Sequence, residues 1–356
     1  MKSLAAIFVE QKKALVLEEV EIPKLTFGQV LVKVICSGIC GSQLGEIDGV
    51  KGEDRYLPHL LGHEGTGEVL ECGEGVTTVK DGDRVVLHWR KGLGIESPTP
   101  KYHSAKFGKI NGGWITTFNQ YAVISENRLT VIPSDFDPEV GALMGCAVTT
   151  GLGVINNNAK VKIGESVIVW GAGGIGLNIV QGAALVSAYP IIAIDLFDNK
   201  LDLAKKMGAT HTINGKTANI EEEILAIVGK SGADIAIDNT GNPEIISRAY
   251  RITSPRGRTI LVGVPAKGEE TQIYTLPLHF EKVLKGSHGG ESNPHIDIPR
   301  YVTLYSKGIL KLDPLITHRY KLEQINEAIA KMRTGEITGR CVVAMSDAYG
   351  PLHYDH

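Results

Sequence analysis

Three short glycine-flanked stretches of this 356-residue chain contain side chains that can bind a transition metal. These side chains are Cys40, His63 and Cys146. Two thiolates and one imidazole are one of the ligand sets of catalytic zinc, which keeps a fourth position open for water or substrate, and these donors suit zinc better than magnesium or calcium. Each residue alone also fits a packing role, because cysteine is among the most buried residue types and single histidines occur in cores and on surfaces. The residue types therefore indicate a zinc site but leave the packing interpretation open.

A fourth stretch, Ser166-Val-Ile-Val-Trp-Gly-Ala-Gly-Gly-Ile-Gly176, could bind a pyrophosphate. It predicts a short buried strand, a glycine turn and a helix that continues from Leu177 to about Val186. A glycine at the first position allows a tight turn, one at the third lets the backbone approach the phosphates, and one at the sixth lets the helix pack closely on the strand. The helix N-terminus adds unpaired N–H groups. The predicted cofactor-binding residues of this turn are Gly171, Gly173, Gly174, Ile175 and Gly176.

An acidic residue follows the turn at the distance expected for a dinucleotide site. The next apolar run, Pro190-Ile-Ile-Ala-Ile-Asp-Leu196, carries Asp195 near its end. A carboxylate there accepts hydrogen bonds from the adenosine ribose and repels a 2′-phosphate, which favours NAD(H) over NADP(H). Lys200 could still approach the ribose. The alternative is a glycine turn without a ligand, followed by a surface acid.

Composition limits the possible partners. A formal net charge of −3 gives no reason to expect nucleic acid or a membrane surface as a partner. We find no apolar run of membrane-spanning length, and the N-terminal residues meet a charge too early for a signal peptide, so we expect a cytoplasmic protein. The five cysteines are an odd and scattered set, which favours packing or metal-binding thiols over disulfides.

The hydrophobic pattern changes along the chain. Residues 4–85 and 121–133 show short strands such as 29–35, 65–70 and 84–87, whereas residues 88–118 have little periodicity and are predicted to form a long loop. A helix is expected over 137–153. From residue 164 strands alternate with helices, which indicates a parallel sheet. Its predicted strands are 167–170, 191–195, 210–213, 234–237, 259–263 and 283–286, and its predicted helices include 199–207, 220–228 and 243–251. Later helices are expected over 299–307 and 322–334, followed by a last strand over 340–345.

Together, these motifs resemble the zinc-containing medium-chain alcohol dehydrogenases. Cys40-Gly-Ser42, the Gly62-His-Glu-Gly-Thr-Gly67 run, Gly145-Cys146, the glycine turn and Asp195 fall in the order and near the spacing of that family, and the similarity reaches Gly339-Arg340. The resemblance implies an α/β protein of two domains. A mostly-β, GroES-like catalytic domain would comprise residues 1–147 and 291–356, and a Rossmann domain with a doubly wound parallel sheet would comprise residues 148–290.

The resemblance also assigns roles to individual residues. Cys40, His63 and Cys146 would bind the zinc, Glu64 would be a nearby carboxylate that can exchange with water on the metal, and Ser42 would take the substrate proton. Arg340 would contact the cofactor pyrophosphate. The nicotinamide side would be lined by Thr150, Thr240, Val264 and His288. Zinc would act as a Lewis acid that promotes alkoxide formation, and hydride would pass to the nicotinamide.

Three features depart from the pattern of many relatives. Residues 88–118 contain no cysteine, so we expect one catalytic zinc and no structural zinc. Gly45 stands where many relatives have a histidine that ends the proton relay. At the position of the third zinc ligand this chain has Cys146, whereas polyol dehydrogenases of the family often have glutamate. This difference places the chain nearer the alcohol and hydroxymethyl-thiol branches.

The segment 88–118 is basic and aromatic. Its members are His88, Trp89, Arg90, Lys91, Lys101, Tyr102, His103, Lys106, Lys109 and Trp114. Such a set suits a phosphate- or nucleotide-bearing substrate, but charge runs also form ordinary solvated loops. Both interpretations stay open.

We therefore predict a zinc- and NAD-dependent alcohol dehydrogenase that acts on a primary or secondary alcohol, or on the matching aldehyde or ketone. A sugar alcohol or phosphorylated alcohol is a more specific version of this prediction. The alternatives are a zinc-free NAD(P)H reductase of the same superfamily and a catalytically silent nucleotide-binding protein. By family analogy, residues 278–284 would pair across a two-fold axis in a homodimer or homotetramer.

Overall fold

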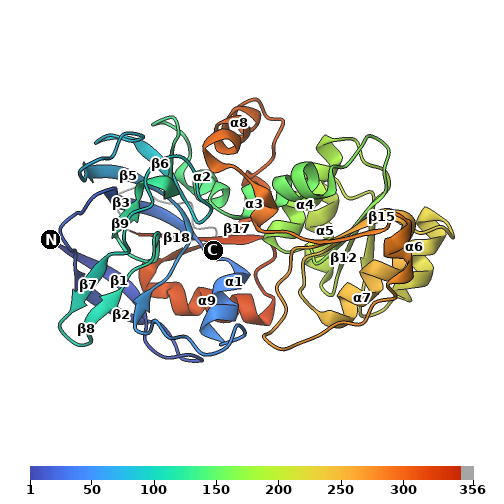
Figure 1. The fold of residues 1–356 in the computed structure, drawn as a ribbon, viewed down its shortest axis with the longest axis horizontal. Coiled ribbons are helices and arrows are strands. Elements are labelled where there is room, and N and C mark those ends of the chain that lie inside the picture. Colours follow the sequence, from blue (N-terminus) through green and yellow to red (C-terminus); the bar gives the residue numbers. More distant parts are fainter. Residues whose placement is uncertain (346–356) are drawn as a thin grey trace. The chain divides into compact units, whose positions relative to one another are not determined.

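The computed structural model describes residues 1–345 and divides the chain into two compact units. The first unit contains Met1–Cys146 and the chain from Asn293 onward, and the second contains Ala147–Ser292. The blue and red ends of the chain thus lie in the same unit (Figure 1). These divisions lie next to the predicted ones at 147/148 and 290/291. Residues 346–356, the end of the predicted catalytic domain, lie outside the described part.

The first unit is built from β-strands in two groups. A closed barrel contains, in spatial order, β1 (Lys2–Phe8), β2 (Val16–Glu21), β7 (Lys101–Ser104), β8 (Gly108–Asn111) and β4 (His59–Leu60). A seven-stranded sheet has the order β10 (Leu129–Val131), β6 (Arg84–His88), β5 (Glu64–Cys72), β3 (Gln29–Gly38), β18 (Arg340–Ala344) and β17 (Ile316–Lys321), with β9 (Tyr121–Ser125) also paired to β3.

Strand β3 is the centre of this sheet. It is buried along almost its whole length, which agrees with its β-branched run Val30-Leu-Val-Lys-Val-Ile35. It pairs with β5 through Ser37 and Gly65 and with β18 through Gly38 and Val342. Three segments that are distant in the sequence therefore meet at the end of β3.

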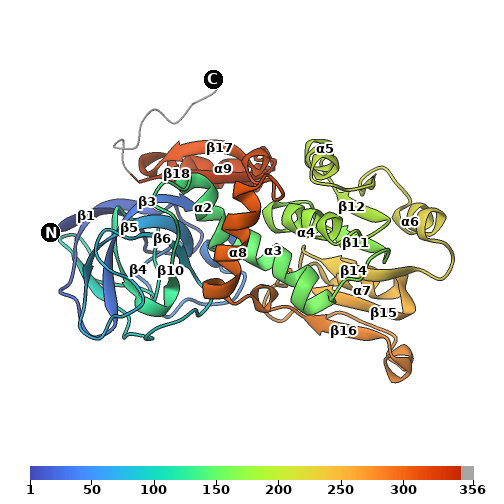
Figure 2. The same ribbon diagram turned by 90° about the horizontal axis from the view of Figure 1, so that it is seen from above.

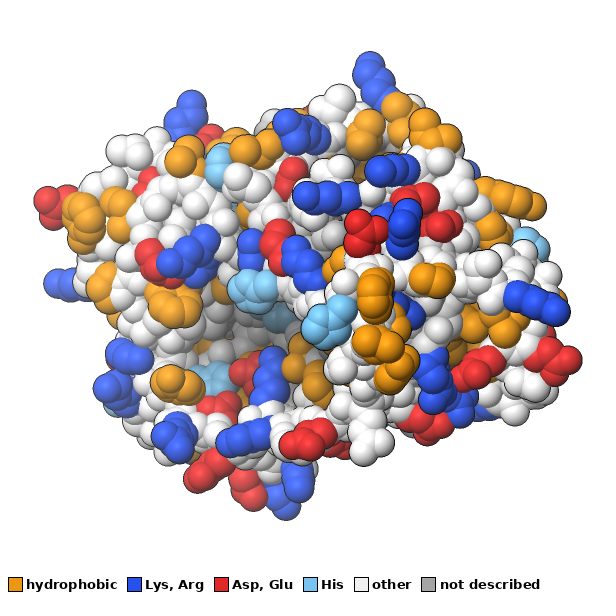
Figure 3. Space-filling model, turned by 45° about the vertical axis from the view of Figure 1, so that its right-hand side comes forward, with side chains coloured by type: hydrophobic (Ala, Val, Ile, Leu, Met, Phe, Trp, Pro, Cys, Tyr) orange, Lys and Arg blue, Asp and Glu red, His pale blue; other side chains and the backbone are white. Residues whose placement is uncertain are grey.

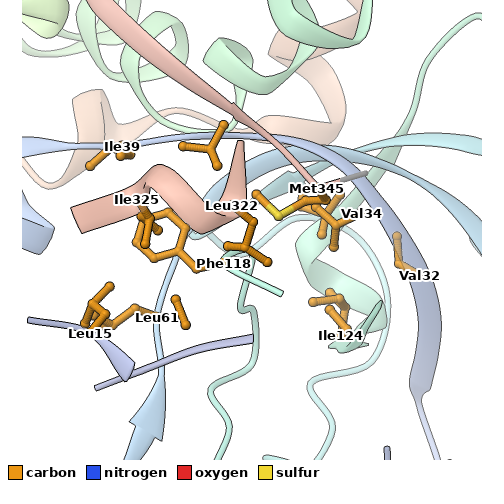
Figure 4. Close-up of a cluster of buried hydrophobic side chains, with 14 of the residues drawn as sticks. Leu15, Val32, Val34, Ile39, Leu61, Phe118, Ile124, Leu322, Ile325 and Met345 are labelled. Atoms are coloured by element: carbon orange, nitrogen blue, oxygen red, sulfur yellow. The ribbon is translucent and has the colours of Figure 1, made fainter. Parts of the chain in front are cut away.

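A hydrophobic core fills the space beneath β3. Val32 and Val34 of β3 belong to the same buried cluster as Phe118, Leu322 and Ile325 (Figure 4). Their near-complete burial removes large apolar surfaces from water, which is the main stabilising term of such a core. This core supports the strand end that holds the candidate metal ligands.

The prediction of a loop over residues 88–118 is wrong in part. Residues 101–111 form the β7–β8 hairpin, which closes the barrel by pairing with β2 and β4. Tyr102 and Ile110 of this hairpin are fully buried, so the apparent irregularity of the segment hides two short strands with alternating burial.

The second unit contains a six-stranded parallel sheet. Its spatial order is β13 (His211–Asn214), β12 (Ile191–Asp195), β11 (Val167–Trp170), β14 (Ala233–Asp238), β15 (Thr253–Leu261) and β16 (Val283–Gly286). Figure 2 shows the strands from β12 to β16 side by side in this order. The order reverses between β11 and β14, and doubly wound sheets bind ligands at such a switch point.

Helices connect these strands much as predicted. They are α4 (Gly174–Leu185), α5 (Asp198–Lys206), α6 (Ile220–Val228) and α7 (Pro243–Ile252). The helix α4 begins before Leu177, its predicted start, so the glycine turn is shorter than expected. The strand β15 is longer than the predicted 259–263 at its N-terminal end.

The predicted helix over 137–153 is interrupted. It consists of α2 (Pro138–Met144) and α3 (Ala147–Gly153), and Val154–Ala159 continues as a π-helix. A Cβ atom at Gly145 would lie 2.3 Å from the carbonyl oxygen of Leu87. The close approach of β6 therefore requires glycine at this break, and the break places Cys146 outside both helices.

Three further helices belong to the first unit: α1 (Gly41–Ile47), α8 (Pro294–Ser306) and α9 (Ile325–Thr334). We did not expect α1, and α8 begins earlier than its predicted start at residue 299.

Across residues 1–345 no single helix is long and apolar enough to cross a membrane. Taken together, α2 and α3 with its π-helical continuation reach the length and apolar composition of a membrane span. Acidic and basic side chains are interspersed on the face shown in Figure 3, in keeping with a small net charge.

Candidate active site

The three predicted metal ligands converge in the first unit. The Sγ atoms of Cys40 and Cys146 and a ring nitrogen of His63 all lie within 4.8 Å of one another. Cys40 follows the end of β3, His63 precedes the start of β5, and the Ser37–Gly65 pairing of these strands brings the two residues together. Cys146 reaches them through the close packing of Gly145 on Leu87 and Glu64. The separation suits three ligands of one tetrahedral zinc ion.

The environment of these ligands also suits a cation. Cys40 and Cys146 are 4% and 5% exposed. The Nε2 atom of His63 is buried and has no hydrogen-bond partner among residues 1–345, which is unusual for a buried polar atom and is explained when the imidazole binds a ligand. Hydrogen bonding with Cys146 lowers the pKa of the Cys40 thiol well below its ordinary value, and His63 and Arg340 act in the same direction against the effect of burial. The site therefore favours the thiolate form that zinc requires.

Other cysteines of the chain behave as packing residues. Burial raises the pKa of Cys36 well above its ordinary value and that of Cys341 to about 11. Cys72 is half-buried, and desolvation again raises its pKa to about 11. These three thiols stay protonated at neutral pH, in contrast to Cys40, whose pKa is lowered.

Glu64 forms a buried ion pair with Arg340 beside the candidate metal site. Glu64 is fully buried and Arg340 is 4% exposed. The pairing of β18 with β3 at Val342 and Gly38 brings the guanidinium to this position. A Cβ atom at Gly38 would lie 2.8 Å from the Glu64 carboxyl, so a side chain there would displace the carboxylate. No motif in the sequence predicts this pairing. The contact of Arg340 with a pyrophosphate and the exchange of Glu64 on the metal stay predictions.

Helix α1 positions the first ligand. Cys40 is its N-cap residue, and the backbone N–H of Cys40 donates a 2.8 Å hydrogen bond to Oε1 of the buried Gln43 side chain. Ser42 lies in the first turn of α1 and is exposed, and Gly45 lies on the same helix. Sequence reasoning missed Gln43, although a glutamine three residues after an N-cap is a known capping signal.

Replacing Gln43 with alanine is expected to weaken zinc binding about tenfold, as loss of an orienting partner does in other zinc sites. The backbone of Cys40 then loses the hydrogen bond that fixes its direction. Competition with a chromogenic chelator measures this effect. A Gln324→Ala variant, which removes the equivalent glutamine cap from the short helix after Lys321, is the control and should bind zinc normally; an equal loss in both variants would contradict a specific role for Gln43.

The glycine turn of the second unit has the geometry of a phosphate-binding turn. Gly171 adopts φ 91°, which disfavours residues with a side chain. A Cβ atom at Gly176 would lie 1.9 Å from the carbonyl oxygen of Gly171, whereas one at Gly173 would meet no protein atom within 4 Å. Gly174 and Ile175 open α4, whose N-cap is Gly173 and carries no side-chain cap. The first-turn N–H groups are thus available to an anion.

Asp195 holds the turn against the end of β12. Its Oδ2 atom accepts a 2.8 Å hydrogen bond from the backbone N–H of Ala172, and its Oδ1 atom accepts from Leu196 and Phe197. A carboxylate has further lone-pair sites for a ribose hydroxyl. The ammonium of Lys200 lies 5.0 Å from the ring centroid of Phe197. Asp195 therefore has a structural role besides its predicted contact with the cofactor.

The four residues predicted on the nicotinamide side occupy different positions in the second unit. Val264 and His288 line one cavity of about 460 Å³. Thr240 follows β14 and donates a 2.6 Å hydrogen bond to the buried Asp238, whose pKa is raised by burial. Thr150 is buried within α3. The contact of these four residues with a nicotinamide stays a prediction.

A second cavity reaches the candidate metal ligand His63. It has a volume of about 440 Å³ and lies within the first unit. Its walls include Leu61, Ile115 and Trp114 as apolar members and Glu46 and Lys101 as charged ones. Its volume lies within the usual range for small-molecule sites.

The basic residues of the segment 88–118 do not act as one group. His88 is fully buried, with Nδ1 2.7 Å from the carbonyl oxygen of Arg90 and Nε2 2.9 Å from Oγ1 of Thr130. Lys91 forms an ion pair with Glu96, and Lys101 donates to Asn111. Because these side chains already have partners within the chain, the contacts favour a structural role over the binding of a phosphate.

His88 is expected to make stability depend on pH. Burial lowers its pKa from 6.5 to about 4, so between these values the unfolded chain binds a proton that the folded chain does not. Folding stability from this group is therefore complete above pH 6.5 and is lost as the pH falls toward 4, by up to about 3 kcal/mol. Urea unfolding of the native protein and of His88→Gln across this range measures the difference, which should shrink on acidification; a constant difference would contradict the prediction.

Comparison with known proteins gives matches over nearly the whole chain. Residues 26–134 match the alcohol dehydrogenase GroES-like domain, and residues 174–307 match the zinc-binding dehydrogenase model. An S-(hydroxymethyl)glutathione dehydrogenase of Paracoccus denitrificans is 32% identical, with 94% of this chain and 98% of that protein covered. An alcohol dehydrogenase class-3 of Cereibacter sphaeroides is also 32% identical, covering 96% of this chain and 100% of its own length.

Solved structures agree with these matches. The alcohol dehydrogenase zinc-binding domain protein from Burkholderia ambifaria superposes with a TM-score of 0.89 at 28% identity, covering 97% of this chain and 99% of its own. Benzyl alcohol dehydrogenase from Acinetobacter calcoaceticus superposes with a TM-score of 0.87 at 28% identity, covering 97% and 100%.

Proposed function

Because the chain belongs to the zinc-containing medium-chain alcohol dehydrogenases, we propose that Cys40, His63 and Cys146 hold a single zinc ion at which an alcohol is oxidised or its carbonyl reduced. The predicted family, the predicted fold class and the assignment as an alcohol dehydrogenase are confirmed by the comparisons. The observation that carries the site assignment is the convergence of two cysteines and a histidine whose buried Nε2 has no hydrogen-bond partner within the described chain.

Zinc in this site supplies Lewis-acid polarisation of the substrate oxygen, and a nicotinamide cofactor supplies hydride exchange. The two thiolates and the imidazole bind the metal and keep the site neutral overall. The Glu64–Arg340 pair lies beside them in a buried environment, where charges interact more strongly than in water. We assign Ser42 as the residue that takes the substrate proton, since its exposed hydroxyl follows Cys40 in α1.

We propose NAD(H) as the cofactor in preference to NADP(H). Support comes from the carboxylate of Asp195, which lies at the end of β12 and is tied to the glycine turn through Ala172. A 2′-phosphate at this position would meet a negative charge.

For the substrate we propose an alcohol with an apolar body. The cavity that includes His63 offers Leu61, Ile115 and Trp114, and one structural relative is a benzyl alcohol dehydrogenase. The curated relatives named for S-(hydroxymethyl)glutathione make that compound the second candidate. A phosphorylated alcohol is less favoured, because Lys91 forms an ion pair with Glu96 and Lys101 donates a hydrogen bond to Asn111.

Elemental analysis and a substrate screen test this function together. Protein purified without chelators is expected to contain about one zinc per chain, with no structural zinc, and to form NADH with benzyl alcohol or S-(hydroxymethyl)glutathione. A zinc content near zero that added zinc does not restore would favour the zinc-free reductase. Normal zinc and NADH binding without turnover of alcohols, polyols or their phosphates would favour the silent nucleotide-binding protein.

We also propose that the chain forms a homodimer through the sheet edge at β16. This strand is the last of its sheet, and the preceding residues expose Tyr274, Leu276 and Phe280 to 67%, 50% and 66%. An unpaired edge with exposed apolar neighbours is a common self-association surface. Light scattering of the purified protein measures the mass; a monomer at micromolar concentration would refute the proposal.

A further inference from the structure

A second group of possible metal ligands lies in the first unit, and two of its members line the same cavity as His63. It consists of Glu46, Asp54 and His59, whose ligand atoms lie within 4.8 Å of one another. From its geometry and charge we propose that this group binds a divalent cation that prefers oxygen and nitrogen ligands, such as Mn²⁺. The proposal does not depend on the alcohol dehydrogenase activity.

The hydrogen bonds of His59 define which nitrogen can bind a cation. Its Nδ1 atom lies 2.9 Å from the carbonyl oxygen of Leu60. A carbonyl oxygen only accepts, so Nδ1 carries a proton, which leaves Nε2 as the ring nitrogen that can bind a cation. The ring also packs edge-to-face on Phe8 at 5.2 Å and is 9% exposed. A backbone carbonyl that orients a histidine in this way is typical of metal-binding histidines.

Nε2 of His59 faces a carboxylate oxygen rather than a donor. It lies 2.9 Å from Oδ2 of Asp54, while Oδ1 of the same carboxylate accepts the backbone N–H of Tyr56 at 2.8 Å. Two acceptors at this distance repel each other unless a proton or a metal ion lies between their lone pairs. Two ligands in neighbouring octahedral positions at about 2.1 Å from a metal lie about 3 Å apart, which matches the observed separation.

The ligands also match a divalent cation in charge. Glu46 and Asp54 supply two carboxylates and His59 supplies a ring nitrogen, and the side chain of Glu46 has no hydrogen bond or ion pair within residues 1–345. A divalent cation neutralises both carboxylates and uses all three ligands. Carboxylate, imidazole and water ligands together suit Mn²⁺.

The surroundings hold the ligands and leave access to them. Gln11 donates a 2.8 Å hydrogen bond to the carbonyl oxygen of Gly52 and thereby fastens the loop that carries Asp54. Glu46 lines both the cavity that contains His59 and a neighbouring hollow of about 260 Å³ that contains Asp54. Water can therefore complete the coordination of a bound cation.

Titration of the zinc-loaded protein with Mn²⁺ tests the proposal, with free Mn²⁺ followed by electron paramagnetic resonance. We expect one Mn²⁺ per chain with a Kd below about 1 mM, without loss of zinc, because Mn²⁺ does not compete for thiolates. Glu46→Gln, Asp54→Asn and His59→Gln should each weaken this binding at least about tenfold. Glu53→Gln removes an exposed neighbouring carboxylate and is the matched control, which should bind Mn²⁺ normally.

Two results would overturn the proposal. One is the absence of Mn²⁺ binding to the native protein at millimolar concentration, which would leave His59 as a protonated partner of Asp54. The other is binding that survives in all three ligand variants, which would place the cation elsewhere. Circular dichroism of each variant shows whether the fold is retained, and the result for the native protein decides the question even if a variant does not fold.

Discussion

Replacing Cys146 with serine is expected to remove most of the zinc and to lower alcohol oxidation roughly a thousandfold, since Lewis-acid assistance contributes several kcal/mol to such reactions. Serine has no thiolate, and the two remaining ligands, Cys40 and His63, are too few for a stable zinc site. The variant should still bind NADH, because the glycine turn belongs to the other compact unit. Elemental analysis, steady-state kinetics and NADH fluorescence measure the three quantities.

The control for this experiment is Cys72→Ser. Cys72 is half-buried and its pKa is raised to about 11, so it should not take part in metal binding. The control should keep its zinc and its activity. Full activity in Cys146→Ser, or equal loss of zinc in both variants, would contradict the assignment of the metal site.

Replacing Asp195 with asparagine is expected to shift the preference for NAD over NADP by at least roughly tenfold in favour of NADP, because it removes the repulsion of a 2′-phosphate. Asparagine keeps one oxygen that can accept the N–H of Ala172, which the carboxylate accepts at 2.8 Å in the native protein, but its NH2 group cannot accept from Leu196 and Phe197. The turn should therefore keep its contact with β12 and lose some stability. The ratio of kcat/KM for the two cofactors measures the change.

Asp195→Gly separates the two roles of this residue. Glycine removes the charge and also the hydrogen bond to Ala172, so both cofactors should bind more weakly than in Asp195→Asn, and the turn should lose stability. If the ratio of kcat/KM stays unchanged in both variants, Asp195 does not contact the ribose.

The second unit could be predicted from the sequence with few errors. The strands β11, β12 and β16 and the helix α6 have the predicted bounds, because short apolar runs bounded by turns and an amphipathic helix are local patterns.

The elements of the first unit were harder to predict from the sequence. The helix α1 has Gly41 and Gly45, which are poor helix formers, and it depends on the Gln43 cap and on burial of Ile47. The strands β7 and β8 are only four residues each, and prolines before β7 and glycines after β8 obscure their alternation.

The candidate site shows the same division between local and long-range information. The glycine turn is continuous in the sequence, so its geometry follows from the motif. The meeting of Cys40, His63 and Cys146 depends on the register of β3 with β5 and on the packing of Gly145. The residue types indicated a zinc site but left a packing role open, and the resemblance to a family favoured the zinc site. The ion pair of Glu64 with Arg340 and the group at Glu46, Asp54 and His59 arise from strand and loop packing that no spacing rule predicts.

The position of β18 next to β3 has a consequence for biosynthesis. All three proposed zinc ligands are translated before the second unit, but Arg340, the partner of the buried Glu64, is translated after it. The contiguous second unit can fold on the ribosome while the first still lacks the strands β17 and β18. Until β18 is added, Glu64 would be a carboxylate without its counter-charge, which is costly to bury. We therefore expect the metal site to mature only after β18 leaves the ribosome, so that nascent chains truncated before residue 340 acquire NADH binding but no stable zinc.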